Sequence, residues 1–415
     1  MAEAPLNDWH IIVADASLDL ILQKTQGAPC SEAVALNIHD ASARNLLVQR
    51  ADIVISLMPP ALHYLVAQDC LAFGKNLLTA SYVDDQLRAL QPEIEAKGLL
   101  FLCEMGLDPG IDHMSAMQLI DGIKAEGGTI TSFKSHCGGL VAPESDDNPW
   151  HYKISWNPRN VVMAGKAGAE YKEENFLVEL HYDKLFTGGH ACFINEELGS
   201  LGYYPNRDSL SYIPLYGLQA ATTFVRTTLR YPDFLLGWQQ IVALKLTDET
   251  PDFDSDGKTL QDFFTDRFAK KGFQLETATE LVQQQLLYLG AADNALLINK
   301  GLCSAADVLQ FALEQKLALR PTDKDMIVMK HEIEYVLNSQ VNAIDSVLVV
   351  KGSDSLRTAM AKTVGLPLGI AAKLILNGTI REKGVLIPIA PAIYNAVLPE
   401  LAQQGIVFAE THRAL

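Results

Sequence analysis

The sequence of 415 residues has few cysteines, and they are scattered. The six cysteines stand at positions 30, 70, 103, 137, 192 and 303, with no CxxC spacing among them. This usage excludes a disulfide framework and is typical of a protein kept reduced. Basic residues are in the minority, with 33 Lys and Arg against 50 Asp and Glu and a formal net charge of −17. Because nucleic-acid phosphates and anionic membrane surfaces repel such a protein, we expect neither as a partner.

Long apolar runs and targeting signals are also missing. No apolar run approaches the ~20 residues of a membrane span. The N-terminal residues MAEAPLND lack the basic and apolar regions of a signal peptide. The rest of the composition, 48% hydrophobic and 20% charged, is that of a globular protein. We therefore expect a cytoplasmic protein, and its length indicates two or three domains.

Short apolar runs alternate with helical patterns in the N-terminal hundred residues. Strands are predicted at 9–15, 33–36, 53–57, 77–79 and 99–103, with helices at 18–24, 41–48, 62–73 and 84–97. Strands that alternate with helices of this length predict an α/β fold, a doubly wound parallel sheet of the Rossmann-like type.

Glycine is absent where such a sheet would need it to bind a dinucleotide. Asp15 closes a predicted strand, where an acid can hydrogen-bond the adenosine ribose of NAD; capping of the next helix is its alternative role. The fingerprint also requires a strand and a Gly-rich turn ~20 residues earlier. Only fourteen residues precede Asp15, and none is glycine. We expect a truncated reading frame to explain this, leaving the sheet N-terminally incomplete around Ile11–Ala14 and Ile53–Ser56 unless another segment fills the slot.

The segment Glu104–His113, with the sequence EMGLDPGIDH, follows the last predicted strand and precedes an amphipathic helix. Ligands of open α/β sheets bind at the carboxyl ends of strands, and a helix N-terminus favours anionic groups. Asp108 is therefore a candidate for holding the ammonium or the reacting part of a substrate, and a helix cap is its alternative role.

The pattern changes after residue 129. Strand-like runs with turns cover 129–216, and a helix is predicted at 218–229. Charged, Leu-rich helices are predicted at 257–320 and strands at 325–329 and 346–350. A long helix is predicted at 358–376, where Asn377-Gly378 ends it. We assign residues 1–112 and 356–415 to the Rossmann-like domain, 113–246 and 322–355 to an α+β domain, and 247–321 to a helical subdomain.

Several motifs resemble, in the same order, those of the saccharopine dehydrogenase family. They are Gly106–His113, Cys137–Glu144, Asn148-Pro149, Trp156–Arg159, Pro205–Ser209, Arg226–Arg230, Asp325–His331 and Thr358–Pro367. The resemblance runs from about Trp9 to the C-terminus. It implies a Rossmann-like domain closed by the C-terminal segment, an α+β domain for substrate binding and dimerisation, and a helical insertion.

The resemblance also implies an activity and a partner. The implied reaction is the oxidative cleavage of saccharopine to glutamate and 2-aminoadipate semialdehyde, or its reverse, in lysine metabolism. The resemblance also implies that the reaction uses a nicotinamide cofactor and that the protein is a homodimer. Two alternatives stay open. One is a dehydrogenase for another C–N-linked amino acid, such as carboxynorspermidine. The other is a non-catalytic paralogue that cannot take NAD.

The candidate substrate-binding residues suit a molecule with three carboxylates. Arg207, Arg226 and Arg230 can clamp carboxylates through paired donors. Asn206 stands beside the first of them, and Trp156 can wall the carbon chain of the substrate. We expect Asp108, Cys137, Trp156, Asn206, Arg207 and Arg226 to converge on one cleft between the Rossmann-like sheet and the α+β domain.

The candidates for proton transfer are Tyr82, Asp108 and Cys137, with His113 and a bound water also possible. Cys137 stands before Gly138-Gly139, where backbone could approach a ligand, but a small buried hydrophobe is its alternative role. His113 has packing or capping as its alternative role.

Cofactor binding is assigned to Asp15, Leu57, Met58, Pro59 and Ser81. Asp15 would repel a 2′-phosphate, so NAD is expected rather than NADP. No metal site is expected, because neither His190-Ala-Cys192 nor Asp108 with Asp112 and His113 has a recognised ligand spacing.

Overall fold

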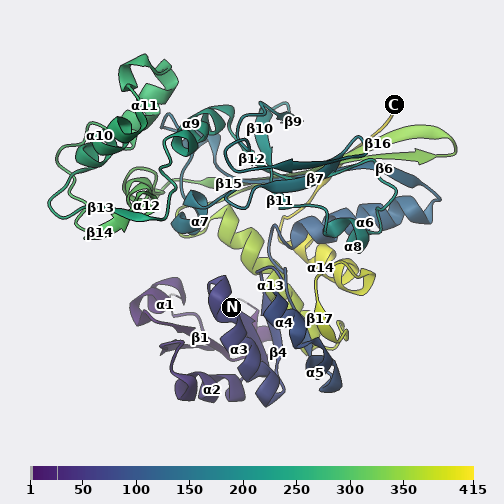
Figure 1. Cartoon of the computed structure of the whole chain (residues 1–415). Helices are drawn as coiled ribbons and strands as arrows, with labels where there is room; N and C mark the ends of the chain where they lie inside the picture. Colours follow the sequence, from purple (N-terminus) through teal and green to yellow (C-terminus); the bar gives the residue numbers. More distant parts are fainter. Residues whose placement is uncertain (1–2, 26) are drawn as a thin grey trace. The chain divides into compact units, whose positions relative to one another are not determined.

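The computed structural model describes residues 3–25 and 27–415, and the chain divides into two compact units (Figure 1). Unit 1 contains Met1–Ser115 and Val364–Gln403, and unit 2 contains Ala116–Thr363 and Gln404–Leu415. Two helices, α6 (Ile111–Ala125) and α13 (Ala359–Leu376), begin in one unit and end in the other.

Unit 1 is built on a four-stranded parallel sheet in the order β17-β5-β4-β3. Its strands are β3 (Ile53–Ser56), β4 (Asn76–Thr79), β5 (Leu100–Leu102) and β17 (Gly384–Leu386). The helices of this unit are α1 (Leu18–Thr25), α2 (Ala41–Arg50), α3 (Pro60–Phe73), α4 (Asp85–Ala89), α5 (Gln91–Ala96) and α14 (Pro391–Gln403), with a 3-10 turn at Ala4–Leu6. The pairing of β17 with β5 confirms that the C-terminal segment closes the Rossmann-like sheet.

The expected break in this sheet is present. β1 (Ile11–Asp15) and β2 (Ser31–Ala35) pair with each other in parallel as a separate sheet, and no described strand joins β1 to β3. In the 3-2-1-4-5-6 order of a dinucleotide-binding sheet, β1 and β3 would flank the first strand. The parallel α/β fold is therefore confirmed, with its central strand absent from the described residues.

The core of unit 1 lies under the four-stranded sheet. Leu77 and Phe101 point from the strands into a cluster with apolar residues of α3 such as Val66 and Cys70. Helices cover both faces of parallel sheets, so these strands read as continuous apolar runs rather than alternating ones. β3 is different, because Ile55 is 39% exposed on the strand beside the break.

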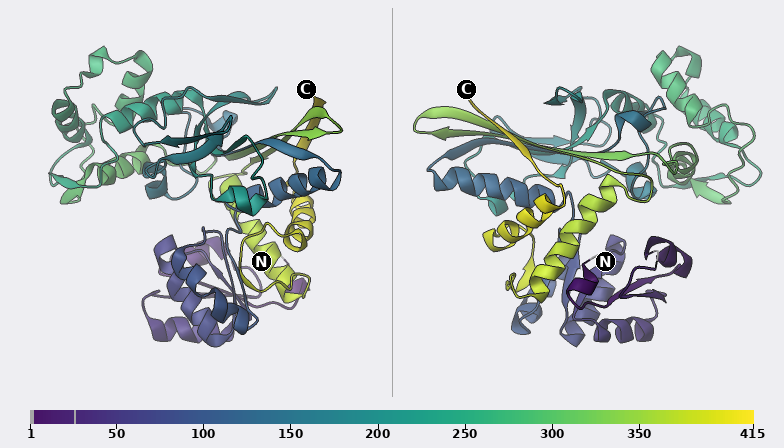
Figure 2. Two further views of the ribbon diagram at one scale, coloured as in Figure 1. Left: turned by 45° about the vertical axis from the view of Figure 1, so that its right-hand side comes forward. Right: turned by 180° about the vertical axis from the view of Figure 1, so that it is seen from behind.

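Unit 2 is built on a ten-stranded mixed sheet, counted over the described residues. Its main path is β11 (Arg207–Asp208), β7 (Ala169–Glu173), β12 (Thr223–Arg230), β6 (Thr129–Val141), β15 (Asp325–Leu337), β16 (Gln340–Lys351) and β18 (Ala409–Ala414). β8 (Phe176–Leu180) pairs with β7, while β9 (Ala191–Asn195) and β10 (Gly199–Pro205) form a hairpin that joins β12. Figure 2 shows the last strand, β18, running beside the long β15–β16 hairpin. The end of the chain thus pairs with the α+β sheet, whereas the sequence assignment placed it in the Rossmann-like domain.

The helix predicted at 218–229 is wrong, because β12 occupies Thr223–Arg230. Its residues are rich in Thr and Val, which favour strands. Seven of the eight are buried, so both faces of the strand are covered, and its backbone pairs with β6 on one side and with β7 and β10 on the other. A strand buried on both faces shows no two-residue alternation, so its sequence could not be told from a buried helix.

The helices predicted at 257–320 are confirmed, and they gather at one end of the large sheet in Figures 1 and 2. They are α10 (Leu260–Lys271), α11 (Glu280–Tyr288) and α12 (Ala305–Lys316), with a 3-10 turn at Leu275–Thr277. The hairpin of β13 (Pro251–Asp254) and β14 (Leu302–Ser304) was not predicted. Helix α9 (Pro232–Ala243) contributes Trp238, which packs with Trp150 and Phe263 in an extensive apolar cluster of the unit.

Helix α13 confirms the predicted apolar helix and its stop, since Gly378 follows with a φ of 76°. Its first backbone N–H groups, from Ala359 and Met360, donate to the buried carboxylate of Asp325 at 2.6 and 2.9 Å. Two of the sequence motifs, Asp325–His331 and Thr358–Pro367, are joined by this cap. Of the described helices, α13 alone is long and apolar enough to cross a membrane. That is weak evidence for a span, because buried core helices share this composition.

Candidate functional site

The loop after β5 in unit 1 is a tight turn built on two glycines. Gly106 N donates to Pro109 O at 3.0 Å, and Ile111 N donates to Gly106 O at 2.9 Å. Gly110 has a φ of 146°, and a Cβ placed there would lie 2.1 Å from Gly106 O. Only glycine fits this position, so the loop that carries Asp108 has one backbone path.

His113 is part of the buried support of this loop. Its Nε2 lies 2.9 Å from Glu104 Oε2, and its Nδ1 lies 3.6 Å from Asp112 Oδ2. Asp112 Oδ1 in turn accepts from Gly110 N at 2.6 Å. The imidazole is fully buried between two carboxylates, and this arrangement favours a packing role for His113 over proton exchange with a substrate. Asp108 itself is only partly buried in the same loop.

The carboxyl ends of β3 and β4 are joined through a histidine that the sequence analysis missed. His63 Nδ1 lies 2.8 Å from Ser56 Oγ, and His63 Nε2 lies 2.7 Å from Ser81 Oγ. Ser81 O accepts from Glu104 N at 3.0 Å, which links this network to the loop of Asp108. Burial of the imidazole lowers the pKa of His63. The predicted residue Ser81 therefore contacts a buried histidine, and the predicted residue Tyr82 follows it in the chain.

The remaining predicted cofactor residues lie along the break between β1 and β3. Asp15 is exposed at the end of β1, and its Oδ1 accepts from Ser17 N at 2.9 Å. Leu57, Met58 and Pro59 form the loop after β3, with Leu57 73% exposed. No Gly-rich turn accompanies them in the described part of unit 1. These residues fit the ribose-binding part of a dinucleotide site, but not its pyrophosphate-binding part.

In unit 2, strand register places three predicted residues on one face of the large sheet. Arg226 pairs with Ser135 and Thr228 pairs with Cys137 in the parallel β12–β6 ladder. Side chains two residues apart share a face, so Arg226, Cys137 and Arg230 project to the same side. The two arginines are four residues apart, about 13 Å along a strand. Cys137 lies level with the midpoint between them.

Arg230 is a buried cation that no carboxylate of the described residues neutralises. It is 4% exposed, its Nη1 donates to Leu229 O at 2.8 Å, and its Nε has no hydrogen-bond partner. Its guanidinium stands over the rings of Tyr152 and Phe234, at 5.3 and 5.5 Å from their centroids. A buried charge without a partner is costly, so this geometry suits an anionic ligand.

Arg226 is held by the segment that follows β10. Its backbone N donates to Ser209 Oγ at 3.0 Å, and its carbonyl accepts from Asn206 N at 2.8 Å. Its guanidinium lies 4.4 Å from the centroid of Tyr212. Arg207 is exposed on the short edge strand β11 with a φ of 53°. The motif Pro205–Ser209 thus supports Arg226 through Asn206 and Ser209.

Trp156 is linked to Arg230 through Tyr152, which the sequence analysis did not identify. Trp156 Nε1 donates to Tyr152 OH at 3.1 Å, and Tyr152 is the ring beneath the Arg230 guanidinium. Asn148 accepts from Trp150 N at 3.0 Å and donates to Tyr152 O at 3.1 Å, which explains the Asn148-Pro149 motif. Burial raises the pKa of Tyr152.

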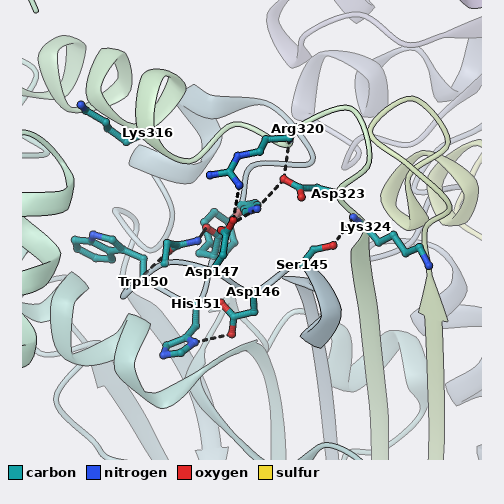
Figure 3. Close-up of polar contacts among 12 residues, drawn as sticks. Ser145, Asp146, Asp147, Trp150, His151, Lys316, Arg320, Asp323 and Lys324 are labelled. Carbon is teal, nitrogen blue, oxygen red and sulfur yellow. Dashed lines mark hydrogen bonds and ion pairs between the residues drawn. The ribbon is translucent and has the colours of Figure 1, made fainter.

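An ion-pair network holds the same segment against the start of β15. Figure 3 shows Asp147 and Asp323 turned toward Arg320, with distances of 2.7 Å from Arg320 Nη1 to Asp147 Oδ2 and 2.8 Å from Arg320 N to Asp323 Oδ2. Lys153, which is buried, contacts both carboxylates at 2.9 and 2.6 Å. His151 pairs with Asp146 beside this network. These charges are neutralised internally, which distinguishes them from Arg230.

The glycines after Cys137 lie close to other protein atoms. A Cβ on Gly138 would lie 2.6 Å from Leu229 O, and one on Gly139 would lie 2.7 Å from Met360 Cε. The close approach at these glycines is to the backbone of β12 at Gly138 and to the flexible end of the Met360 side chain at Gly139. A cavity of about 340 Å³ lies nearby and is lined by Ile154, Ser155, Pro158, Glu314, Ala318, Leu319, Ser355 and Thr358. None of the predicted site residues is among these lining residues, although Ser155 and Pro158 flank Trp156 in the chain.

The predicted residues thus form two groups, one in each unit. Unit 1 holds Asp15, Leu57, Met58, Pro59, Ser81, Tyr82 and Asp108. Unit 2 holds Cys137, Trp156, Asn206, Arg207, Arg226 and Arg230. Within unit 2, Cys137 shares a sheet face with Arg226 and Arg230, and Trp156 joins them through Tyr152. Convergence of the two groups on one cleft stays a prediction.

An interrupted dinucleotide-binding sheet and an α+β unit with buried arginines define a class of two-unit proteins that bind pyridine nucleotides. Family models match both parts: the saccharopine dehydrogenase NADP binding domain at residues 3–102 and the saccharopine dehydrogenase C-terminal domain at residues 106–406. The chain belongs to the saccharopine dehydrogenase family.

Individual relatives agree with this assignment. The chain is 32% identical over 405 residues to "Saccharopine dehydrogenase [NADP(+), L-glutamate-forming]" of Saccharomyces cerevisiae, covering 92% of this chain and 89% of the relative. It is 33% identical over 435 residues to "Alpha-aminoadipic semialdehyde synthase" of Arabidopsis thaliana, covering 97% of this chain. The chain spans only 41% of the length of that synthase.

A solved structure also resembles this one closely. The apo saccharopine dehydrogenase (L-Glu forming) from Saccharomyces cerevisiae superimposes with a TM-score of 0.88 at 30% identity, covering 100% of this chain and 96% of the other. The homospermidine synthase of Legionella pneumophila, with a TM-score of 0.53 and 10% identity, shares the fold alone.

Proposed function

We propose that this protein is a saccharopine dehydrogenase-type oxidoreductase of lysine metabolism. It would oxidise the C–N bond of saccharopine to give glutamate and 2-aminoadipate semialdehyde, or catalyse the reverse reductive condensation. Family membership supports the reaction class. The observation that supports saccharopine as the substrate is the pair of buried arginines, Arg226 and Arg230, on one sheet face. Cys137 lies level with the midpoint between them.

The spacing of the arginines suits an extended substrate with carboxylates far apart. One carboxylate bound at Arg230 would supply the negative counter-charge that this buried guanidinium lacks within the protein. A second carboxylate at Arg226 would then lie about 13 Å away along the strand. Trp156 and Tyr152 offer apolar ring surface beside Arg230 for the carbon chain. Saccharopine has three carboxylates and a long chain, which fits this arrangement better than a carboxylated polyamine with fewer anionic groups.

The reacting amine would lie between the two carboxylate sites. A bound nicotinamide would supply the hydride acceptor. The chain's own residues must remove the proton of the secondary amine and activate water to hydrolyse the resulting substrate imine. Tyr82, Asp108 and Cys137 stay the candidates for these proton transfers, and His113 is less suited because it is buried between Glu104 and Asp112.

For the cofactor, we propose NAD in preference to NADP. The supporting feature is the exposed carboxylate of Asp15 at the end of β1, which would accept from ribose hydroxyls and repel a 2′-phosphate. The yeast relative is named for NADP(+), so the two cofactors must be compared directly. Asp15→Ser should narrow the preference for NAD over NADP by about fivefold, because one unfavourable charge contact is worth about 1 kcal/mol. Equal kinetic efficiency of the unaltered protein with NAD and NADP would contradict this assignment.

We also propose that the protein is a homodimer. The supporting feature is the edge strand β8, on which Phe176 and Leu177 are both 73% exposed. Apolar side chains on an unpaired edge are typical of an interface. Sedimentation of the protein and of a Phe176→Ser, Leu177→Ser double variant would test this, and a monomeric unaltered protein would contradict it.

Calorimetry with saccharopine tests the proposed substrate without requiring the cofactor. We expect one saccharopine site per chain, and we expect Arg230→Met to bind saccharopine more weakly than the unaltered protein. Saccharopine-dependent reduction of NAD or NADP, with glutamate measured as the product, tests the reaction. Tighter binding of carboxynorspermidine than of saccharopine would overturn the assignment of saccharopine as the substrate. Binding of neither compound would support the non-catalytic alternative.

A further inference from the structure

The face of the large sheet opposite Arg226 and Cys137 carries a second cluster of reactive side chains. His136 precedes Cys137 in β6, so its side chain points to the other face. Glu332 in β15 points to the same side, because Lys330 pairs directly with His136 and side chains two residues apart share a face. Cys192 of the β9–β10 hairpin closes the cluster. None of these three residues belongs to the substrate-binding group.

The three ligand atoms are already close together. His136 Nε2 lies 3.4 Å from Glu332 Oε2, and Cys192 Sγ lies 3.7 Å from Glu332 Oε1. One imidazole nitrogen, one sulfur and one carboxylate oxygen lie within 4.8 Å of one another. His136 and Cys192 are buried, while Glu332 is partly exposed and offers a path from solvent.

We propose that His136, Cys192 and Glu332 bind a divalent ion of the zinc class. Zinc binds nitrogen and oxygen at about 2.0–2.1 Å and sulfur at about 2.3 Å in tetrahedral sites. In such a tetrahedron, neighbouring ligand atoms are about 3.4 Å apart for nitrogen and oxygen and about 3.6 Å apart for sulfur and oxygen. The two measured distances lie near those values but end on different oxygens of Glu332, and the three ligand atoms lie within 4.8 Å of one another, so the side chains must draw together to enclose the ion.

The imidazole is also oriented as a metal ligand should be. His136 Nδ1 lies 2.7 Å from Thr227 Oγ1 on the neighbouring strand, which leaves Nε2 directed at the cluster. Metal-binding histidines generally use their second nitrogen in such a hydrogen bond, and it fixes the ring. The ring of Tyr203 packs against the imidazole at 4.8 Å between centroids.

Lys330 acts as the cation of the cluster when no ion is bound. Its Nζ lies 2.8 Å from Glu332 Oε1 and 3.1 Å from Asp345 Oδ2, and it donates to Phe193 O at 2.9 Å. An entering ion would replace Lys330 as the partner of the Glu332 carboxylate, and Lys330 would keep its contacts with Asp345 and Phe193. Binding converts the Cys192 thiol to a thiolate, with its proton released to solvent and the sulfur–metal bond formed. The bound ion would tie the β9–β10 hairpin to β6 and β15.

The sequence analysis expected no metal, because the two local sets it considered, His190-Ala-Cys192 and Asp108 with Asp112 and His113, have no recognised ligand spacing. His136 and Glu332 are 196 residues apart, and Cys192 and Glu332 are 140 residues apart. Only the register of β6 with β15 and the position of the hairpin bring them together.

The test uses the full chain, purified without metal-affinity resin and dialysed against a chelator. Zinc titrated by calorimetry should bind with a stoichiometry of one, and cobalt should give a thiolate-to-metal absorption band. Cys192→Ser should abolish the cobalt band and weaken zinc binding at least tenfold, and Thr227→Val should weaken it about tenfold to a hundredfold. Cys303→Ser is the matched control, because Cys303 is a buried cysteine of the same unit outside the cluster.

Two results would overturn the proposal. One is a saturated cobalt complex of the unaltered protein without a thiolate band, or no saturable zinc binding, which would make the cluster an ion-pair network only. The other is equal zinc affinity in the unaltered protein and Cys192→Ser. The cobalt spectrum of the unaltered protein decides the question even if a variant fails to fold.

Discussion

The sheets of the two units protect their apolar residues to different degrees. In unit 2, β6 and β15 have strand neighbours on both sides, and Phe133 and Ile327 are fully buried. In unit 1, β1 and β3 border a break, and Ile55 and Leu57 of the β3 region are exposed. The residues predicted to bind substrate therefore lie on a sheet whose central strands are paired on both sides, whereas those predicted to bind the cofactor lie on an interrupted sheet.

The largest expected effect is on the stability of the complete sheet and its core. Trp238 is 1% exposed and stacks on Phe234 with 5.1 Å between ring centroids. Trp238→Ala should lower the free energy of unfolding of unit 2 by about 3–5 kcal/mol, because it leaves a large cavity. Leu57→Ser, at an exposed position beside the break, should change stability by less than about 0.5 kcal/mol. Urea denaturation would measure both, and similar losses from the two variants would remove the contrast between the units.

Completing the interrupted sheet should have the next largest effect. We expect the chain as given to bind NAD weakly, since the described residues lack a pyrophosphate-binding turn. Adding an apolar strand and a GxGxxG turn before Glu3 should tighten NAD binding at least a hundredfold. Two hydrogen bonds to the charged pyrophosphate are worth about 1.5–3 kcal/mol each. The control carries the same strand with valines in place of the turn glycines. Micromolar NAD affinity without the addition would contradict this prediction.

A smaller effect is expected from removing the unneutralised cation of unit 2. Arg230→Met keeps a long side chain over Tyr152 and Phe234 but removes the charge. Saccharopine binding should weaken by about 1.5–3 kcal/mol, the value of a lost hydrogen bond to a charged group. Arg159→Met is the matched control, because Arg159 is paired with Glu249 and Asp307. Calorimetry that finds the same loss in both variants would remove Arg230 from the substrate site.

The smallest predicted effect is a pH dependence of unit 1. The pKa of His63 is lowered by burial from an ordinary value of 6.5. The unfolded chain therefore binds a proton near pH 6.5 while the folded one does not, so stability is complete above that pH and falls below it. The loss attributable to this one group is at most about 1.4 kcal/mol per pH unit.

The matched variant for this effect is His63→Asn. The unaltered protein should lose more stability than the variant between pH 6.5 and 5.5, as measured by urea denaturation at each pH. The difference between the two proteins isolates His63 from the other titrating groups. Parallel pH profiles would show that His63 is not the group responsible.

Local patterns predicted much of the fold correctly. Ser17 Oγ accepts from Leu20 N and so caps α1, a contact between near neighbours in the chain. The alternation of strands and helices in unit 1 and the end of α13 before Gly378 were also predicted. β12 was missed because a strand that is buried on both faces lacks the alternation on which strand prediction depends.

The sequence by itself determined most of the secondary-structure elements, the lack of glycine before Asp15 and the chemistry of the candidate residues. These depend on the residues present and on interactions between near neighbours in the chain. The tertiary structure alone decided that Arg230 lies over Tyr152, that His63 joins Ser56 to Ser81, and that Glu332 meets His136 and Cys192. The physical reason is that such contacts follow from strand register and side-chain packing between segments distant in sequence, which no local pattern encodes.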